Sequence, residues 1–481
     1  MALSALATAG AREPMRITLD DAITRARTHS VDAAVALDKL RSAYWQYRTY
    51  RADLLPEVTF SATVPAYFKQ YSPYQESDGT YSFVRNNYVE LNGELSITQN
   101  IWLTGGKLSL NTSLDFIRQL DGEKFNRFMS LPVALTLDQP LFAVNNVKWN
   151  RRIEPVRYRE AKAEFISASE DVAVQAITYF FNLLMAIENH EIALQNQANA
   201  EKLYTVALEK RKMGSISEND LLQMELNLLD ARSSVTECKS DMNAARFVLL
   251  SFLDLDEDID LQPVVPSRLA DCTVKYSDAL SKALDNNKFS QSVMRRHLEA
   301  DHEIAKAKGD LRQIDLYAQI GYTGTGDRFR TAFDPLKDNQ IVQLGVKIPI
   351  LDWGKRRGKV KVAQSNKEMV ESQLRNETAD FKQNIYVLVE RFNNQAQRLK
   401  YAERADTIAA RRYNTNVETY LIGRISTLDL NDSQSTKDRT RRDYINELYL
   451  YWSYYYRLRS LTLWNFAANE PIEVDFNEKE Y

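Results

Sequence analysis

The chain has 481 residues, and its 62 lysines and arginines nearly balance its 65 aspartates and glutamates, giving a formal charge of −3. This near-balance excludes the electrostatic footprint expected of a nucleic-acid-binding protein. Only 15 glycines and 12 prolines occur, so we expect long regular elements with few turns. A mean hydropathy of −0.44 indicates that most of the chain lies in water.

A membrane-spanning helix needs roughly 18 consecutive apolar residues. The longest apolar run, 176–187, is shorter and is interrupted by Thr178 and Asn182. If the chain crosses a membrane, we therefore expect strands to make the crossing. The two cysteines, Cys238 and Cys272, are too few to form a disulfide framework.

Residues 1–16 are expected to be a signal remnant or a disordered tail. The small apolar stretch that ends Ala7-Thr8-Ala9 resembles the end of a secretory signal with its cleavage triplet. The basic segment that normally opens such a signal is missing, so both interpretations remain open.

The first structural repeat is expected over 17–251, beginning with a helix at about 18–53. Strands follow over 57–142, and an inserted hairpin at about 88–118 adds two of them; the sequence leaves open whether this hairpin joins the other strands. Apolar residues alternate with polar ones in each segment, as in Val58, Phe60, Ala62 and Val64. Period two predicts a strand with one apolar and one polar face. Membrane barrels have this pattern, and so does a sandwich with one wet face.

The strands are followed by helices of unusual length. Between Trp149 and Met213 there is one proline and no glycine, and such a helix could reach about 95 Å at 1.5 Å per residue. The helix that returns after Gly214 has apolar residues at alternating spacings of three and four, which is typical of a coiled coil. The repeat is therefore predicted to contain a long antiparallel helical hairpin with its tip at 214–217.

The tip sequence occurs twice. Gly214-Ser215-Ile216-Ser217 returns as Gly423-Arg424-Ile425-Ser426, and 423 − 214 is 209. Pro140 and Pro349 are separated by the same 209 positions, whereas Val58 and Ile314 are separated by 256. The chain is therefore an internal two-fold repeat, and its first half carries an insertion after the first strand.

The second repeat is expected over 276–466, with an opening helix, strands at about 313–351 and a helical hairpin whose tip is 423–426. A linker at 252–275 joins the two repeats, and an acidic tail occupies 467–481. The last long helix begins with a run, 431–443, in which every residue is polar. A helix that is polar on all sides is not expected in an apolar core. It is either an exposed outer helix or the lining of a water-filled space, and its place after a hairpin tip favours the lining.

These features together resemble the TolC-like outer-membrane efflux protein family from Ile17 to Phe466. The resemblance rests on the order and duplication of several short motifs: Leu55-Pro56, Gln139-Pro140-Leu141-Phe142, Tyr179-Phe180 and the two Gly-x-Ile-Ser tips. It implies an α+β membrane protein of the Gram-negative outer membrane, with a transmembrane β-barrel shared between three protomers and coiled-coil helical hairpins in the periplasm. Six alternating segments are also too few for one chain to enclose a water-filled lumen.

The resemblance also implies site residues. Asp429 and Asp432 match two aspartates that form a constriction at the periplasmic entrance of the pore. Asp220 and Tyr420 match residues whose links hold that entrance shut. The position of their basic partner is occupied by Ile425, so the neighbouring Arg424 is the candidate substitute.

As implied partners we expect a homotrimer, a periplasmic adaptor, an inner-membrane pump and outer-membrane lipid, with no cofactor. The chain would be a passive exit duct for drugs, small toxic ions or secreted polypeptides, and the sequence does not choose among these cargoes. Because both tips keep one short turn while their helices diverge, we expect the tips to dock the adaptor. The tip residues are Gly214, Ile216, Ser217, Gly423, Ile425 and Ser426.

Two other classes of protein are considered. An enzyme is disfavoured, since His297 and His302 lie on different faces of a helix and no phosphate-binding loop or nucleophile elbow occurs. A periplasmic coiled-coil scaffold or adaptor without a barrel is the alternative, and the alternating strands argue against it.

Overall fold

The computed structural model of the chain describes residues 14–121, 124–269, 272–311, 313–347, 350–421, 424–425 and 427–473. Most of the expected signal remnant (1–13) and of the acidic tail (474–481) lies outside the described residues. The chain divides into two compact units, and each is treated by itself. Unit 1 comprises Met1–Ser42, Glu160–Ser290 and Glu377–Tyr481, and unit 2 comprises Ala43–Arg159 and Gln291–Asn376.

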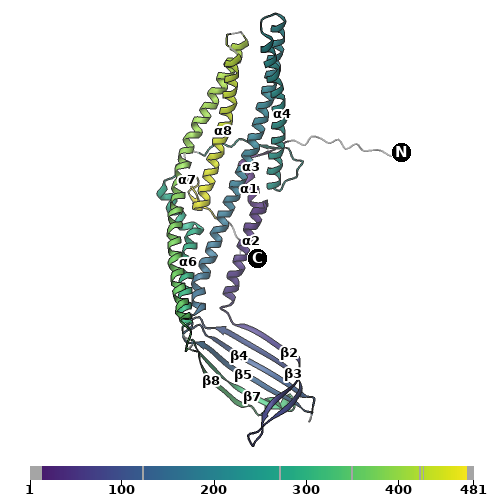
Figure 1. The fold of residues 1–481 in the computed structure, drawn as a ribbon, viewed down its shortest axis with the longest axis vertical. Coiled ribbons are helices and arrows are strands. Elements are labelled where there is room, and N and C mark those ends of the chain that lie inside the picture. The colour runs from purple at the N-terminus through teal and green to yellow at the C-terminus, as the bar shows by residue number, and fades with distance from the viewer. Residues whose placement is uncertain are drawn as a thin grey trace, which may run out of the picture. The chain divides into compact units, whose positions relative to one another are not determined.

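Unit 1 is built from two antiparallel helical hairpins and short flanking helices (Figure 1). The first hairpin pairs α3 (Asn146–Lys212) with α4 (Glu218–Phe252), and the second pairs α7 (Lys355–Leu421) with α8 (Thr427–Thr462). The flanking helices are α1 (Leu19–His29), α5 (Tyr276–Asn286) and the first part of α2 (Val31–Ala52). The long helical hairpins expected from the sequence are confirmed.

The opening helix of each repeat was predicted to be continuous, and this was wrong in the same way twice. In the first repeat α1 gives way to α2 at Ser30, and in the second α5 gives way to α6 (Lys288–Gly309) at Asn287. Both break residues are extended and buried, and each caps the following helix: the N–H of Ala33 donates to Ser30 Oγ, and that of Phe289 donates to Asn287 Oδ1. A buried side-chain acceptor replaces the backbone bond lost at the break.

The apolar core of unit 1 lies where the two hairpins and α1 and α5 meet. Its largest fully buried side chains include Phe180 of α3, together with Ile385 and Phe392 of α7. Buried apolar side chains of α3 continue beyond this core at Ala193 and Ala207, while Leu194 is exposed. One 18-residue window of α3 also reaches a mean hydropathy of 1.2, so the expectation that no helix is apolar enough to span a membrane was wrong on composition. More than half of that window is buried inside the molecule, as in a core helix.

Unit 1 also contains two pairs of short strands. β1 (Met15–Ile17) pairs in parallel with β6 (Leu261–Pro263), so Met15 and Arg16, which were grouped with the tail, form a strand. β9 (Trp464–Asn465) pairs with β10 (Glu470–Pro471). Glu170, which is 1% exposed, pairs with Arg27 of α1 and Arg459 of α8 at 2.5 and 3.0 Å. This buried carboxylate therefore connects three helices.

Unit 2 contains one antiparallel six-stranded sheet in the order β2-β3-β4-β5-β7-β8. The strands are β2 (Glu57–Gln75), β3 (Tyr81–Asn100), β4 (Lys107–Gln119), β5 (Asn126–Pro140), β7 (Gln313–Gly326) and β8 (Lys337–Lys347). A single 3₁₀ turn, η1 (Arg330–Phe333), lies between β7 and β8. The inserted hairpin, whose place the sequence left open, supplies β3 and β4 and joins the sheet between β2 and β5. The helical segments of unit 2 join the sheet at one end of its strands only (Figure 1).

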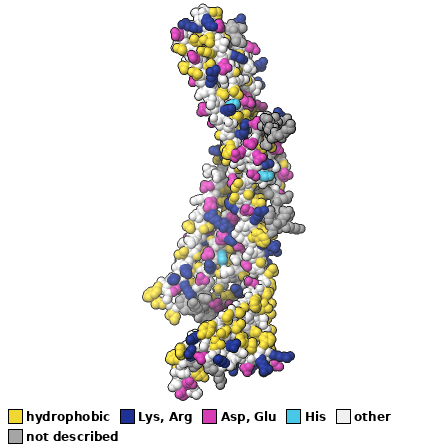
Figure 2. Space-filling model, turned by 90° about the vertical axis from the view of Figure 1, so that its right-hand side faces the viewer, with side chains coloured by type: hydrophobic (Ala, Val, Ile, Leu, Met, Phe, Trp, Pro, Cys, Tyr) yellow, Lys and Arg dark blue, Asp and Glu magenta, His cyan; other side chains and the backbone are white. Residues whose placement is uncertain are grey.

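One face of the sheet is apolar and uncovered. Cross-strand neighbours form an unbroken apolar row through five strands: Val58, Ile97, Leu110, Leu135 and Ile320. Each of these side chains is 38–64% exposed, and Figure 2 shows hydrophobic side chains gathered over the sheet. Soluble monomers rarely expose a contiguous apolar surface of this kind.

The opposite face of the sheet is polar. Ser96 Oγ donates to Asn111 Oδ1 at 2.9 Å, Thr98 and Ser109 share a hydrogen bond at 3.2 Å, and Asn111 Nδ2 donates to Thr136 at 3.3 Å. The two faces alternate along each strand as the period-two pattern predicts.

Candidate functional site

The tip of the first hairpin is a glycine turn followed by a capped helix. Gly214 has φ +73°, and the N–H groups of Gly214 and Ser215 donate to the carbonyls of Arg211 and Lys210 at 2.9 and 2.8 Å. This pair of bonds satisfies the last carbonyls of α3 and requires a left-handed residue, which favours glycine. Ile216, between the turn and α4, is half-buried.

Asp220, the expected gate residue, takes part in the cap of α4. Ser217 Oγ accepts from the N–H of Asp220, and the Asp220 carboxylate accepts from the N–H and the hydroxyl of Ser217 at 3.1 and 2.8 Å. These hydrogen bonds hold the pKa of the Asp220 carboxyl below its ordinary value. The capping box by itself accounts for an aspartate six residues after Gly214.

The second tip is described only in part. Gly423 and Ser426 lie outside the described residues, as do the side chains of Tyr420 and Thr427. Arg424 is exposed and its N–H donates to the carbonyl of Thr419 at 3.1 Å, while Ile425 is half-buried. The expected link between Tyr420, Asp220 and Arg424 is therefore not visible among the described residues.

The two acids of the expected constriction begin α8. Asp429 lies in the first turn of the helix, where a carboxylate is favoured by the helix dipole, and it is exposed. Asp432 follows one turn later, and its Oδ2 accepts from Arg412 Nη2 of α7 at 2.8 Å. Arg412 was not predicted from the sequence. Counting equal distances outward from Gly423 and Ser426 brings Lys437, not Asp432, opposite Arg412, so simple spacing along the hairpin does not predict this pair.

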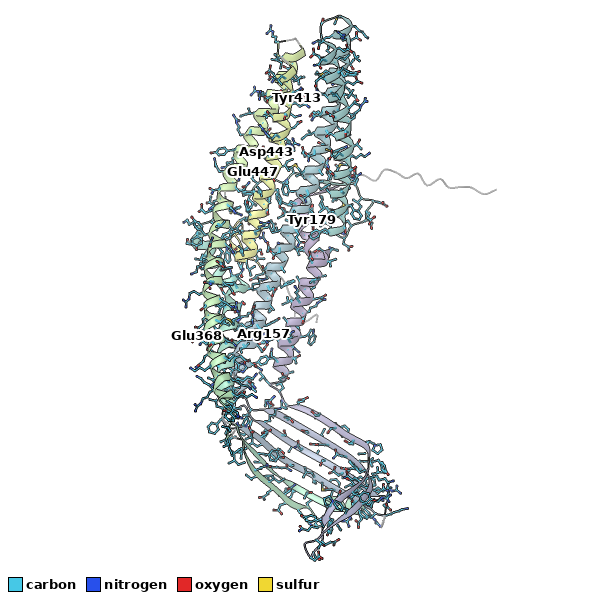
Figure 3. The ribbon with its side chains drawn as sticks, viewed as in Figure 1. Arg157, Tyr179, Glu368, Tyr413, Asp443 and Glu447 are labelled. Atoms are coloured by element: carbon cyan, nitrogen blue, oxygen red, sulfur yellow. The ribbon has the colours of Figure 1, made fainter. Side chains whose placement is uncertain are left out.

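The polar start of α8 is buried along one face by hydrogen bonds. Ser433 and Asp438 are buried, and Asn196 of α3 donates to Asp438 at 2.8 Å. Lys437 lies 4.7 Å from the centroid of the Tyr413 ring, and Asn199 donates to the Tyr413 hydroxyl at 2.7 Å. The remaining faces, including Arg439 and Asp443, are exposed. Figure 3 labels Tyr413 on α7 and Asp443 on α8.

Arg441 also belongs to that face and contacts two other helices. It donates to both oxygens of Glu188 on α3, at 2.7 and 3.1 Å, and to Asp406 on α7 at 3.3 Å. The hydrogen bonds to Glu188 raise the pKa of Arg441. Although its start is polar, α8 is therefore not a fully solvated helix. One face contacts two other helices, and the opposite face is exposed to water.

A polar cavity of about 340 Å³ lies between α3, α4 and α8 in unit 1. Its lining includes Asn196, Asn227, Asn431 and Asp438. Near the tips, polar groups around this cavity lie between the two hairpins. Farther from the tips, the core between the hairpins is apolar. Polar contacts therefore join the helices near the tips, together with a few buried apolar side chains such as Leu228 and Leu430.

Comparison with known families decides the class of protein. The family model for outer membrane efflux proteins matches residues 22–253 and 290–462. The chain belongs to the outer membrane efflux protein family. The two matched segments fall in the two sequence repeats, so the TolC-like resemblance and the repeated fold are confirmed.

Solved efflux channels share the fold. The CmeC channel of Campylobacter jejuni superposes with a TM-score of 0.67 at 16% identity, over 95% of this chain and 87% of that one. VceC of Vibrio cholerae gives 0.64 at 15% identity, over 95% and 97%. MtrE of Neisseria gonorrhoeae, solved in its open state, gives 0.59 at 13% identity, over 92% and 88%. No curated protein sequence matches the chain.

Membership of this family assigns the two faces of the sheet and the helical part to their surroundings. This efflux protein is an outer-membrane channel and not an enzyme, and its helical part extends into the periplasm. The uncovered apolar face of the six-stranded sheet is then the face toward lipid, and the hydrogen-bonded polar face is the one toward water. The expected outer-membrane location is confirmed, and the alternative of a scaffold without a barrel is excluded.

Proposed function

We propose that this efflux protein works as a homotrimer, the exit duct through which a periplasmic adaptor and an inner-membrane pump pass their cargo to the exterior. The observation that carries the trimer is the open sheet. β2 and β8 each have one edge with no strand partner among the described residues. Unpaired backbone groups are not tolerated in lipid, so these edges must pair with other copies.

The strand count favours three copies. Three sheets of six strands supply eighteen strands, and barrels of 16–18 strands leave an aqueous channel. A single sheet of six cannot enclose one. Three copies are also the smallest closed ring that reaches this size.

A groove in unit 2 supports contacts between copies outside the membrane. The groove between α6 and α7 has a volume of about 560 Å³ and an apolar floor that includes Ala300, Ala307, Val362 and Val370. Val362 is 60% exposed in the single chain. Charged residues such as Lys306 and Glu303 flank this floor, a distribution typical of a surface that a second helix covers.

At the other end of the duct, we propose that Asp429 and Asp432 from three copies narrow the entrance. The position of both acids at the start of α8, beside the tip, supports this. Arg424 and Asp220 are proposed to link the two tips in the closed state, with Tyr420. Asp220 caps the start of α4 directly after the first tip, and Arg424 is exposed within the second tip. Both side chains therefore lie within a turn of a hairpin tip.

The two tips are proposed as the docking surface for the adaptor. Ile216 and Ile425 occupy equivalent places in the two repeats, and both are half-buried, while Ser215, Ser217 and Arg424 beside them are exposed. An apolar side chain held at a tip by a capped turn is a suitable anchor for a partner helix.

The proposed function is tested on the purified full-length protein. Native mass measurement in detergent should give three copies, and reconstitution in a planar bilayer should give ion conductance. Washing outer membranes at alkaline pH should leave the protein in the membrane fraction. A monomeric particle without conductance would contradict the proposal.

A further inference from the structure

The sheet contains more strands than the duplicated unit requires. The second repeat contributes two strands, β7 and β8, whereas the first contributes four. The offsets of the repeat match β2 with β7 and β5 with β8, since Val58 corresponds to Ile314 and Pro140 to Pro349. The hairpin of β3 and β4 is therefore an addition to a four-stranded ancestral arrangement.

The inserted hairpin is part of the wall of the sheet along its whole length. β3 pairs with β2 from Glu57↔Thr98 to Gln75↔Tyr81, and β4 pairs with β5 from Lys107↔Asp138 to Arg118↔Asn126. The apolar row and the polar row both continue through β3 and β4 without interruption. A hairpin that lay outside the barrel would not be expected to continue the apolar row on one face and the polar row on the other.

The strands on either side of the hairpin remain complementary to each other. Through the intervening strands, Val58 of β2 is in the same row as Leu135 of β5, and Tyr67 is in the same row as Asn126. These two rows belong to one antiparallel register, because the bulge of β2 near Val64 and the bulge of β5 near Pro132 compensate each other. Direct pairing of β2 with β5 in this register would oppose apolar side chains on the lipid face, Val58 with Leu135 and Phe60 with Val133.

We infer that the β3–β4 hairpin enlarges the outer-membrane barrel from twelve strands to eighteen and thereby sets the size of cargo that the barrel passes. The inference rests on the proposed trimer, in which each copy adds one hairpin. Because barrel diameter grows roughly in proportion to strand number, the hairpins widen the barrel by about half and its cross-section by about twofold. The added wall is mostly polar on the water side, where Glu90, Glu94 and Asp115 lie among hydroxyl and amide side chains and one apolar residue, Ile117.

The first test removes the hairpin together with the end of β2 at 68–75, and it keeps residues 57–67 of β2 and all of β5, β7 and β8. Residues 68–125 are replaced by Asn-Gly, a two-residue turn that joins Tyr67 to Asn126 in the register described above. Uncharged polymers of graded size are added from the exterior side of a planar bilayer, so that they sample the barrel and not the periplasmic entrance. The largest polymer radius admitted should fall by about one third, from eighteen strands to twelve. An unchanged limit in a conducting trimer would overturn the inference.

The second test leaves the strands intact, in case the shortened sheet does not assemble. Cys238 and Cys272, both free thiols, are first replaced by Ser. Ser96→Cys then places a thiol on the polar face of β3, and Ile97→Cys, its matched control, places one on the apolar face. A charged, membrane-impermeant thiol reagent should modify Ser96→Cys and reduce conductance, and should leave Ile97→Cys unmodified. Equal modification of both would show that the hairpin does not line the lumen.

A failure of the inferred widening can be distinguished from a failure of the proposed function. If native mass measurement does not give three copies, the proposed assembly is wrong. If it gives three copies but the lumen is lined by only four strands of each chain, with Ser96→Cys and Ile97→Cys reacting alike, the channel function stands and only the inferred widening is wrong.

Discussion

Arg441 on α8 holds the carboxylate of Glu188 on α3 in a two-pronged hydrogen bond, with distances of 2.7 and 3.1 Å. The two residues are 253 positions apart, and they belong to different helical hairpins of unit 1. Both side chains are largely screened from solvent, Arg441 at 32% and Glu188 at 16% exposure. Asp406 of α7 completes the cluster, so one guanidinium connects three helices. This charge contact therefore supports the position of α8 at the edge of the apolar core, one turn from Ile445.

Replacing Arg441 by Met is expected to destabilise unit 1 by about 2 kcal/mol, because two half-buried carboxylates lose their cation. Arg441→Lys should recover only part of this loss, since an ammonium cannot donate to both oxygens of Glu188 in one plane. Thermal unfolding of the detergent-solubilised protein measures the effect. The neighbouring Arg442 is exposed, and Arg442→Met is the control. Equal losses in both variants would mean that the cluster does not hold the hairpins together.

The capping box of the first tip gives a prediction about local stability. Ser217→Ala removes the acceptor for the N–H of Asp220 and should weaken the start of α4 by about 1 kcal/mol. Hydrogen exchange of the first-turn amides should then be about fivefold faster, with little change in the amides at the distal end of α4. Ser215→Ala, in the same turn but outside the cap, is the control.

The same box predicts an acid-dependent change at the tip. Because hydrogen bonds from Ser217 lower the pKa of Asp220 from its ordinary value of 3.8, the carboxylate stabilises the folded tip above that pH. The stabilisation is lost as the pH falls through the lowered pKa of the folded state. Amide protection at the start of α4 should therefore decrease below pH 3.8 in the wild type. Asp220→Asn should abolish this decrease; if it persists, another group causes it.

The pairing of Asp432 with Arg412 predicts that this arginine weakens the attraction of the entrance for cations. Replacing Asp429 and Asp432 by Asn should lower cation selectivity in a planar bilayer and abolish block by trivalent cations added from the periplasmic side, since rings of carboxylates attract such ions. Arg412→Gln removes the charge that offsets Asp432 and should lower the blocking concentration about twofold to fivefold. Arg411→Gln, one position away, is the control. Wild-type selectivity and block in the double variant would place both acids on an ordinary helix surface.

The tips are tested by charge. Ile216→Asp together with Ile425→Asp should abolish export in cells, because a carboxylate at each anchor opposes burial against the adaptor. The trimer should remain assembled, since the tips end both hairpins and lie outside the apolar core. Ile408→Asp, at an exposed isoleucine of α7 that lies away from the tips, is the control. Export that survives the double variant, or fails equally in the control, would show that the tips are not the docking surface.

The sequence by itself determined the two faces of the strands, the helical hairpins and the family. Period-two alternation in Val58, Phe60 and Val64 is a local property, and it is preserved whichever strand lies alongside. The duplicated Gly-x-Ile-Ser turn is local as well, because the left-handed Gly214 and the Ser217 cap are built from residues within one turn of each other.

Only the tertiary structure decided which elements are neighbours. The inserted hairpin could have lain outside the barrel, and the register from Glu57↔Thr98 to Arg118↔Asn126 places it within the sheet. The breaks at Ser30 and Asn287 and the buried polar face of α8 were likewise not encoded in periodicity. Strand pairing and the contact of Arg441 with Glu188 join groups far apart in the chain, and their free energy depends on the surrounding burial. Local pattern sets which face of an element is apolar, whereas long-range packing sets what that face meets.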